Sequence, residues 1–91
     1  MSRPKMASFD YTAIIDGDYA MHLKVTAEKR RDKCATQRWY KARVKVDIPN
    51  PVDEEYFVDL FPLIKEDINQ TPALRDSRII WLGYRVSHGH K

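Results

Sequence analysis

Apolar and polar side chains alternate along three stretches of the chain, and a period of two predicts β-strands with one buried face. The first two stretches, residues 9–15 and 19–26, flank the pair Asp16-Gly17, which supplies the positive φ angles of a tight hairpin turn. The third stretch, residues 39–48, alternates most regularly. The positions predicted to face a core are Phe9, Tyr11, Ala13, Ile15, Tyr19, Met21, Leu23, Val25, Tyr40, Ala42, Val44, Val46 and Ile48.

A charged segment, residues 28–37, separates the second and third stretches, and we predict that it is a connector. Residues 28–38 hold five Lys or Arg and two acids, and their apolar residues are only Cys34 and Ala35. Because such a segment has little to bury, we expect it to be mobile in the free protein and to become ordered against an acidic or phosphate-bearing surface.

The period changes after residue 50, where the sequence predicts a helix over residues 51–69. Asn50 suits the N-cap and Pro51 the first helical position, and acidic residues follow in the first turn. Pro62 interrupts this pattern, since an interior proline kinks or splits a helix, and residues 55–61 also alternate as a strand would. The apolar stripe predicted to face the sheet is Val52, Tyr56, Leu60, Ile64 and Ile68, widened by Phe57, Phe61 and Leu63.

Residues 78–86 alternate again and predict a last strand after a polar connector. Its predicted core face is Ile80, Leu82, Tyr84 and Val86, and its opposite face is Ile79, Trp81, Gly83 and Arg85. The order β-β-β-α-β predicts an α+β fold in which a small antiparallel sheet carries one helix on one face. We expect one domain over residues 1–91, with flexible ends at residues 1–7 and 87–91.

Composition bears on whether this domain is secreted, inserted in a membrane or kept in a reducing compartment. No apolar run approaches the ~20 residues that span a bilayer, and no apolar segment follows the basic N-terminus, so we expect neither a membrane segment nor a secretory signal. Cys34 is the only cysteine and cannot form an internal disulfide. We therefore expect a reducing, cytoplasmic location.

Charge is distributed unevenly along the chain although the net charge is only +3. Residues 22–46 hold nine Lys or Arg against two acids, whereas residues 47–67 hold seven acids against one Lys. This split predicts a protein with a basic side and an acidic side. The plainest alternative is a pair of solvated surfaces without a partner.

The sequence contains no catalytic motif, since the three glycines are scattered and no phosphate-binding or nucleophile motif occurs. We therefore expect no catalytic residue and no cofactor. His88-Gly89-His90 offers two imidazoles, but two ligands near a chain end bind a metal weakly, and we expect no metal site.

The basic row on residues 41–45 is the strongest candidate for a binding site, because side chains two residues apart share one side of a strand. Trp39 heads this row, and Trp81 is predicted to share its face. Cations interleaved with aromatic side chains suit phosphates and unpaired bases. The predicted binding residues are Lys24, Lys29, Arg30, Arg31, Lys33, Arg38, Trp39, Lys41, Arg43 and Lys45.

These features predict a binding protein without enzymatic activity, which docks its basic sheet face on nucleic acid or a nucleoprotein complex and acts by occupancy. The alternative is an inhibitor or adaptor, of the kind that phages and mobile elements carry, which blocks a host complex through an acidic or aromatic-lined protein surface. Exposed aromatics beside arginines suit that alternative too, since they are typical of interface hot spots.

Overall fold

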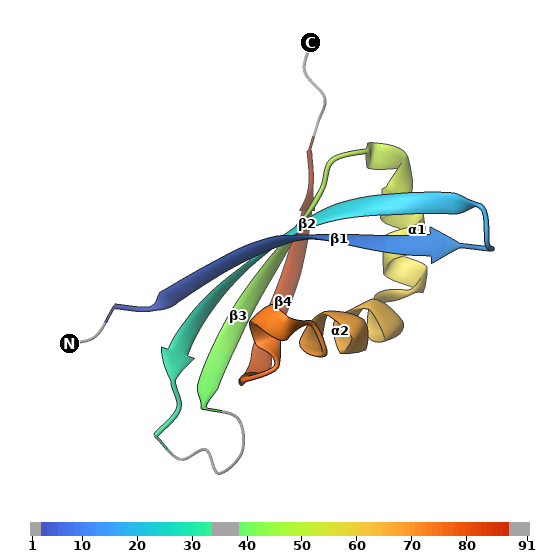
Figure 1. Ribbon diagram of the computed structural model, residues 1–91. Helices are drawn as coiled ribbons and strands as arrows, with labels where there is room; N and C mark the ends of the chain where they lie inside the picture. Colours follow the sequence, from blue (N-terminus) through green and yellow to red (C-terminus); the bar gives the residue numbers. More distant parts are fainter. Residues whose placement is uncertain (1–2, 34–38, 88–91) are drawn as a thin grey trace.

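The computed structural model describes residues 3–33 and 39–87, which form four strands and a short helical connection (Figure 1). The elements are β1 (Lys5–Ile15), β2 (Tyr19–Arg31), β3 (Tyr40–Ile48), η1 (Pro51–Asp53), α1 (Glu54–Asp59), α2 (Phe61–Asn69), η2 (Pro72–Leu74) and β4 (Ser77–Val86). The α+β class and the order β-β-β-α-β are confirmed.

The four strands form one sheet in the order β1-β2-β3-β4. The pairs β1–β2 and β2–β3 are antiparallel as expected, but β4 runs parallel to β3, so the sheet is mixed. The helical connection explains this difference. It returns the chain to the end at which β3 began, and a crossover of that length permits a parallel neighbour.

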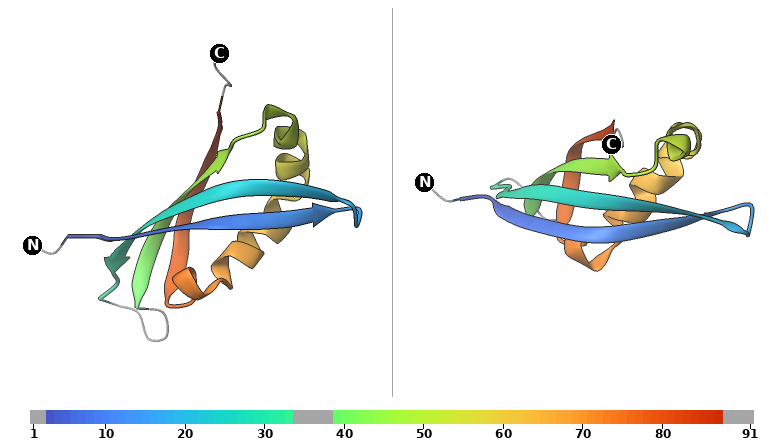
Figure 2. Two further views of the ribbon diagram at one scale, coloured as in Figure 1. Left: turned by 45° about the horizontal axis from the view of Figure 1, so that its top comes forward. Right: turned by 90° about the horizontal axis from the view of Figure 1, so that it is seen from above.

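The hairpin between β1 and β2 turns as the Asp-Gly pair predicts. Asp16 and Gly17 have φ angles of 53° and 86°, and the Asp18 amide donates to the Ile15 carbonyl at 3.2 Å. Figure 2 shows that this hairpin extends beyond the rest of the sheet.

Strands β1 and β2 are longer than the sequence predicted. β1 begins at Lys5, which pairs with Lys29, so residues 5–7 belong to the sheet and not to a flexible end. The prediction of a connector from residue 28 is wrong for residues 28–31, which all pair with β3, and residues 28 and 29 also pair with β1. Charge did not end the strand because a sheet with one open face accepts charged side chains at alternate positions. Residues 34–38 of the predicted mobile loop lie outside the described residues.

Residues 55–59 are helical and Leu60 is a turn between two helices, so this segment is not the strand that the sequence left open as an alternative. The Asn50 side chain accepts from the Val52 amide at 3.3 Å, and Pro51 takes the first helical position, as predicted. Pro62 does divide the helix, since α1 ends at Asp59 and α2 starts at Phe61, with Leu60 between them.

The helical stripe predicted to face the sheet is correct only in part. Phe57, Ile64 and Ile68 are buried as predicted, but Val52, Tyr56 and Leu63 are 66%, 42% and 68% exposed. The reason is that a split helix has two independent buried faces, so a single period does not run through both.

One face of the sheet packs on the helices and forms the core. It consists of Ile15, Met21, Leu23, Val25, Ala27, Ala42, Val44, Val46 and Ile48 from the first three strands, with Phe57, Ile64, Ile68 and Leu74 from the connection. The other face carries no helix, and this arrangement is visible from above in Figure 2. The core therefore lies entirely on one side of the sheet.

A β-bulge at Ile80 alters the predicted faces of β4. Ala42 pairs with Ile79 but Arg43 pairs with Trp81, so one extra residue lies in β4 between them. Leu82 and Val86 face the core as predicted, whereas Ile79 packs against the core and Ile80 is 46% exposed, the reverse of the prediction. Before the bulge, the alternation of β4 is shifted by one position.

Candidate nucleic-acid interface

The open face of the sheet is the side that the helices leave uncovered, and the strand registers place most of the predicted cations there. Lys24, Thr26, Glu28 and Arg30 of β2 lie opposite Asp47, Lys45, Arg43 and Lys41 of β3. On β4, Arg78, Trp81, Gly83 and Arg85 continue these rows. The open face thus holds seven cations (Lys24, Arg30, Lys41, Arg43, Lys45, Arg78 and Arg85) and three carboxylates (Asp10, Glu28 and Asp47).

Four of these cations are already paired with carboxylates, one of which, Glu28, lies opposite Arg43 in the strand register. The pairs are Lys24–Asp10 at 3.7 Å, Arg30–Glu28 at 2.8 Å, Arg78–Asp32 at 3.2 Å and Arg85–Asp47 at 2.8 Å. Because each of these cations already has a carboxylate partner, a new anion would add less binding free energy here than at an unpaired cation.

The central row on β3 is different. Lys41, Arg43 and Lys45 are exposed, and none of them forms an ion pair within residues 3–33 and 39–87. They span five residues of one strand, or about 13 Å. The middle of the open face therefore carries three exposed cations that have no carboxylate partner among the described residues.

Trp81 lies next to this row, on the same face. The Arg43 guanidinium carbon is 4.9 Å from the centre of the Trp81 ring, a cation–π contact, and Trp81 is 43% exposed. The six-membered part of the indole occupies the space above Gly83, because a Cβ added to Gly83 would be 2.4 Å from its Cη2 atom. The side chain therefore lies along β4 over a residue that has no side chain of its own.

Sequence reasoning left Trp81 and two arginines, Arg78 and Arg85, out of the binding set. The period-two pattern of residues 78–86 does place Trp81 and Arg85 on the side opposite the core, so the sequence could have assigned both to the binding set. Arg78 carried no such signal, since the bulge at Ile80 reverses its predicted side.

Trp39 precedes β3 and is 62% exposed. Its backbone is fixed at one end of the sheet, where its amide donates to the Asp76 carbonyl at 2.9 Å and its carbonyl accepts from Asp32 at 2.9 Å. Lys33 is exposed in the turn after β2, and the predicted residue Arg38 lies outside the described residues.

Two predicted binding residues, Lys29 and Arg31, are not on the open face. They lie two and four residues after Ala27 and therefore share its side of β2, the side that bears the helices. Lys29 is 8% exposed. The Lys29 ammonium donates to the Ala73 carbonyl at 2.9 Å and pairs with Asp76 at 3.0 Å. Lys29 therefore fastens the end of the connection to the sheet, and the sequence could not show this because both partners are more than 40 residues away.

Asp76 has a lowered pKa as a result of this contact. Partial burial alone would raise the pKa, but the hydrogen bonds from Lys29 and Ser77 and the charge of Lys29 outweigh that effect. The folded protein thus binds the Asp76 proton less readily than the unfolded chain does.

We expect this carboxylate to contribute to acid sensitivity. Because its folded pKa is below the ordinary value of 3.8, its stabilisation is complete above that pH and is lost as the pH falls from that value through the folded pKa. Urea unfolding of the wild type and of Asp76→Asn, measured from about pH 6 to pH 2, should show a difference in stability that narrows in acid. A constant difference over this range would contradict the assignment.

The helix-bearing side of the molecule is acidic, as the sequence predicted. Three tyrosines from the sheet donate to its carboxylates: Tyr11 to Asp67 at 2.6 Å, Tyr19 to Asp53 at 2.5 Å and Tyr84 to Glu54 at 3.1 Å. Burial and the Asp67 contact raise the pKa of Tyr11, and the hydrogen bonds to Asp53 and Glu54 raise the pKa values of Tyr19 and Tyr84. These hydroxyls therefore remain protonated donors that join the helices to the sheet.

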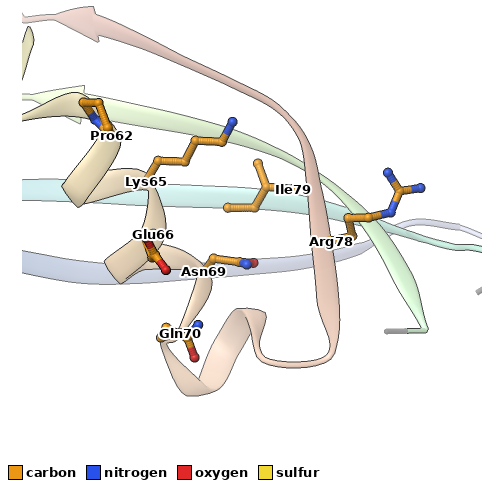
Figure 3. A pocket seen from close by; sticks show the side chains of 7 residues that line it. All are labelled: Pro62, Lys65, Glu66, Asn69, Gln70, Arg78 and Ile79. Carbon is orange, nitrogen blue, oxygen red and sulfur yellow. The ribbon is translucent and has the colours of Figure 1, made fainter. Parts of the chain in front are cut away.

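A pocket of about 380 Å³ lies between α2 and β4 (Figure 3). Its lining residues are Pro62, Lys65, Glu66, Asn69, Gln70, Arg78 and Ile79. In Figure 3, Lys65 and Ile79 extend into the space between α2 and β4, whereas Arg78 points away from α2. This pocket is open and holds charges of both signs, so it lacks the convergent polar groups of a small-molecule site.

No group of three or more His, Cys, Asp or Glu side chains in the described part of the chain is arranged to hold a metal ion. None of the helices in residues 3–33 and 39–87 has the length and apolar character needed to cross a bilayer.

Comparison with protein-family models, with curated proteins and with solved structures found no match to this chain.

Proposed function

We propose that this protein binds nucleic acid, free or within a nucleoprotein complex, through the open face of its sheet, and that it acts by occupying that surface. The observation that carries the proposal is the row Lys41, Arg43 and Lys45, which is exposed and without ion pairs in the described structure. Phosphate neutralisation by such side chains releases counterions, which is the main source of affinity for nucleic acids.

The distribution of charge supports this direction of docking. The acidic residues Glu55, Asp59 and Glu66 are exposed on the helical side, so that side repels phosphates. A polyanion is thus guided to one face of a thin molecule, and no bond is made or broken in the complex.

The direct test is a titration of fluorescently labelled DNA and RNA oligonucleotides at several salt concentrations. We expect the logarithm of the binding constant to fall linearly with the logarithm of the salt concentration. Absence of binding even at low salt would overturn the proposal. Binding to an acidic protein surface in place of nucleic acid, seen in a pull-down from host extract, would favour the inhibitor or adaptor.

A single substitution in the row gives a quantitative expectation. Lys41→Ala should reduce the salt slope by about 0.7 for a single strand and about 0.9 for duplex DNA, the value for one lost phosphate contact. Lys65→Ala on α2 is the matched control, because Lys65 is equally exposed but lies on the acidic side, and its slope should equal that of the wild type.

The position of Lys29 leads to the opposite expectation. Lys29→Met removes a cation that the sequence placed in the site but that contacts Ala73 and Asp76 within the fold. It should lower the melting temperature while leaving the salt slope unchanged. A reduced slope in this variant would mean that Lys29 contacts phosphate.

A further inference from the structure

Resting on the proposed function, we infer that the open face selects single-stranded nucleic acid, with Trp81 as the platform on which an unpaired base stacks. A row of cations by itself serves duplex and single strands alike. The geometry around Trp81 is what distinguishes them.

The Trp81 indole lies where a base could reach it. It extends along β4 over Gly83 and keeps 43% of its surface exposed on the open face. This position of the indole requires glycine at residue 83, because a Cβ there would lie only 2.4–3.2 Å from ring atoms of Trp81. The Trp81 side chain thus lies close against the sheet and remains partly exposed to solvent.

The cations beside Trp81 fit the phosphates that flank a stacked base. Arg43 lies opposite Trp81 in the strand register and its guanidinium lies over the ring, so a base that stacks on Trp81 displaces this guanidinium toward the adjoining phosphate. Lys45 lies opposite Gly83. Base and backbone could therefore be bound together over two neighbouring strand positions. This combination of an aromatic platform with a positive surface is typical of proteins that bind single strands.

The elements that commonly enter a duplex groove are unsuited to it here. The exposed surface of α1 and α2 is acidic, with Glu55, Asp59 and Glu66. The hairpin that extends from the sheet has Asp16 and Asp18 at its tip. In residues 3–33 and 39–87 there is thus no basic helix or basic hairpin tip to enter a groove of the duplex.

The experiment compares an oligothymidylate, or oligouridylate, with the same strand annealed to its complement, at equal salt. The wild type should bind the single strand at least about tenfold more tightly, and Trp81→Ala should lower that affinity about tenfold without changing the salt slope or the duplex affinity. Ile80→Ala is the matched control, because Ile80 is a similarly exposed apolar residue of β4, and it should bind as the wild type does. Gly83→Ala should resemble Trp81→Ala, since it displaces the indole.

A second measurement leaves Trp81, Arg43 and Lys45 unchanged. In Trp39→Phe the only tryptophan is Trp81, and its fluorescence should be quenched by the single strand and unchanged by the duplex. Equal affinity for both forms, or an absence of quenching, would overturn the stacking site while leaving the proposed function in place. If neither form binds to the wild type, both proposals fail together.

Discussion

Replacing Lys41, Arg43 and Lys45 together by Glu is expected to abolish nucleic-acid binding while the domain stays folded. Hydrogen bonds to charged groups contribute about 1.5–3 kcal/mol each, so losing three phosphate contacts should weaken binding at least about a thousandfold. Repulsion by the new carboxylates adds to this loss. The fold should survive because all three side chains are exposed and the neighbouring core residues, Val44 and Val46, are unchanged.

The control for this variant must change the net charge equally on another surface. Replacing Arg31, Lys65 and Arg75 by Glu does so, since these exposed residues lie away from the central row. This control should retain most of the wild-type affinity at moderate salt, where distant charges are screened. If both triple variants lose binding alike, net charge rather than the sheet face determines affinity. Circular dichroism and thermal melting of each variant establish that it is folded.

Phe57→Ala is expected to cause the largest loss of stability. Phe57 is the fully buried residue of α1, and its ring lies 5.6 Å from that of Phe61 and 4.9 Å from that of Tyr84. Truncating a buried phenylalanine costs about 3–5 kcal/mol, a large part of the ~5–15 kcal/mol that stabilises such a domain. The melting temperature should therefore fall by more than about 12 °C.

Leu63→Ala provides the comparison for Phe57→Ala, because Leu63 is an apolar residue of α2 that is 68% exposed. Its effect should stay within about 0.5 kcal/mol. A wild-type melting temperature in Phe57→Ala would show that α1 does not pack on the sheet as described. Since Phe57 is on the helical side, the salt slope of its folded fraction should equal that of the wild type.

Local signals determined the elements of the fold. Alternation predicted the four strands, Asp16-Gly17 predicted the hairpin, and Asn50-Pro51 predicted the start of the helical connection. Each of these signals depends on residues within a few positions of one another, so no tertiary information is needed. The same alternation placed Lys41, Arg43 and Lys45 on one face of one strand, where the structure has them.

Contacts between distant residues determined what the sequence did not. Lys29 lies in a stretch with the composition of a charged loop. Asp76 and Ala73, brought beside it by the crossover connection, and the Tyr40 ring stabilise this buried lysine. Which cations of the open face remain unpaired likewise depends on cross-strand neighbours such as Asp47 and Arg85. Strand register sets these pairs, and one sequence alone does not reveal register.

The sequence by itself determined the α+β class, the basic and acidic halves and the central cationic row, because periodicity and charge are properties of the chain. Only the tertiary structure decided that β4 runs parallel to β3, that its bulge puts Arg78 on the open face, and that Trp81 lies over Gly83 beside Arg43. The physical reason is that a binding surface is assembled across strands. Its residues come from β3 and β4, which are separated by the whole helical connection and meet only when both strands pack on the common core.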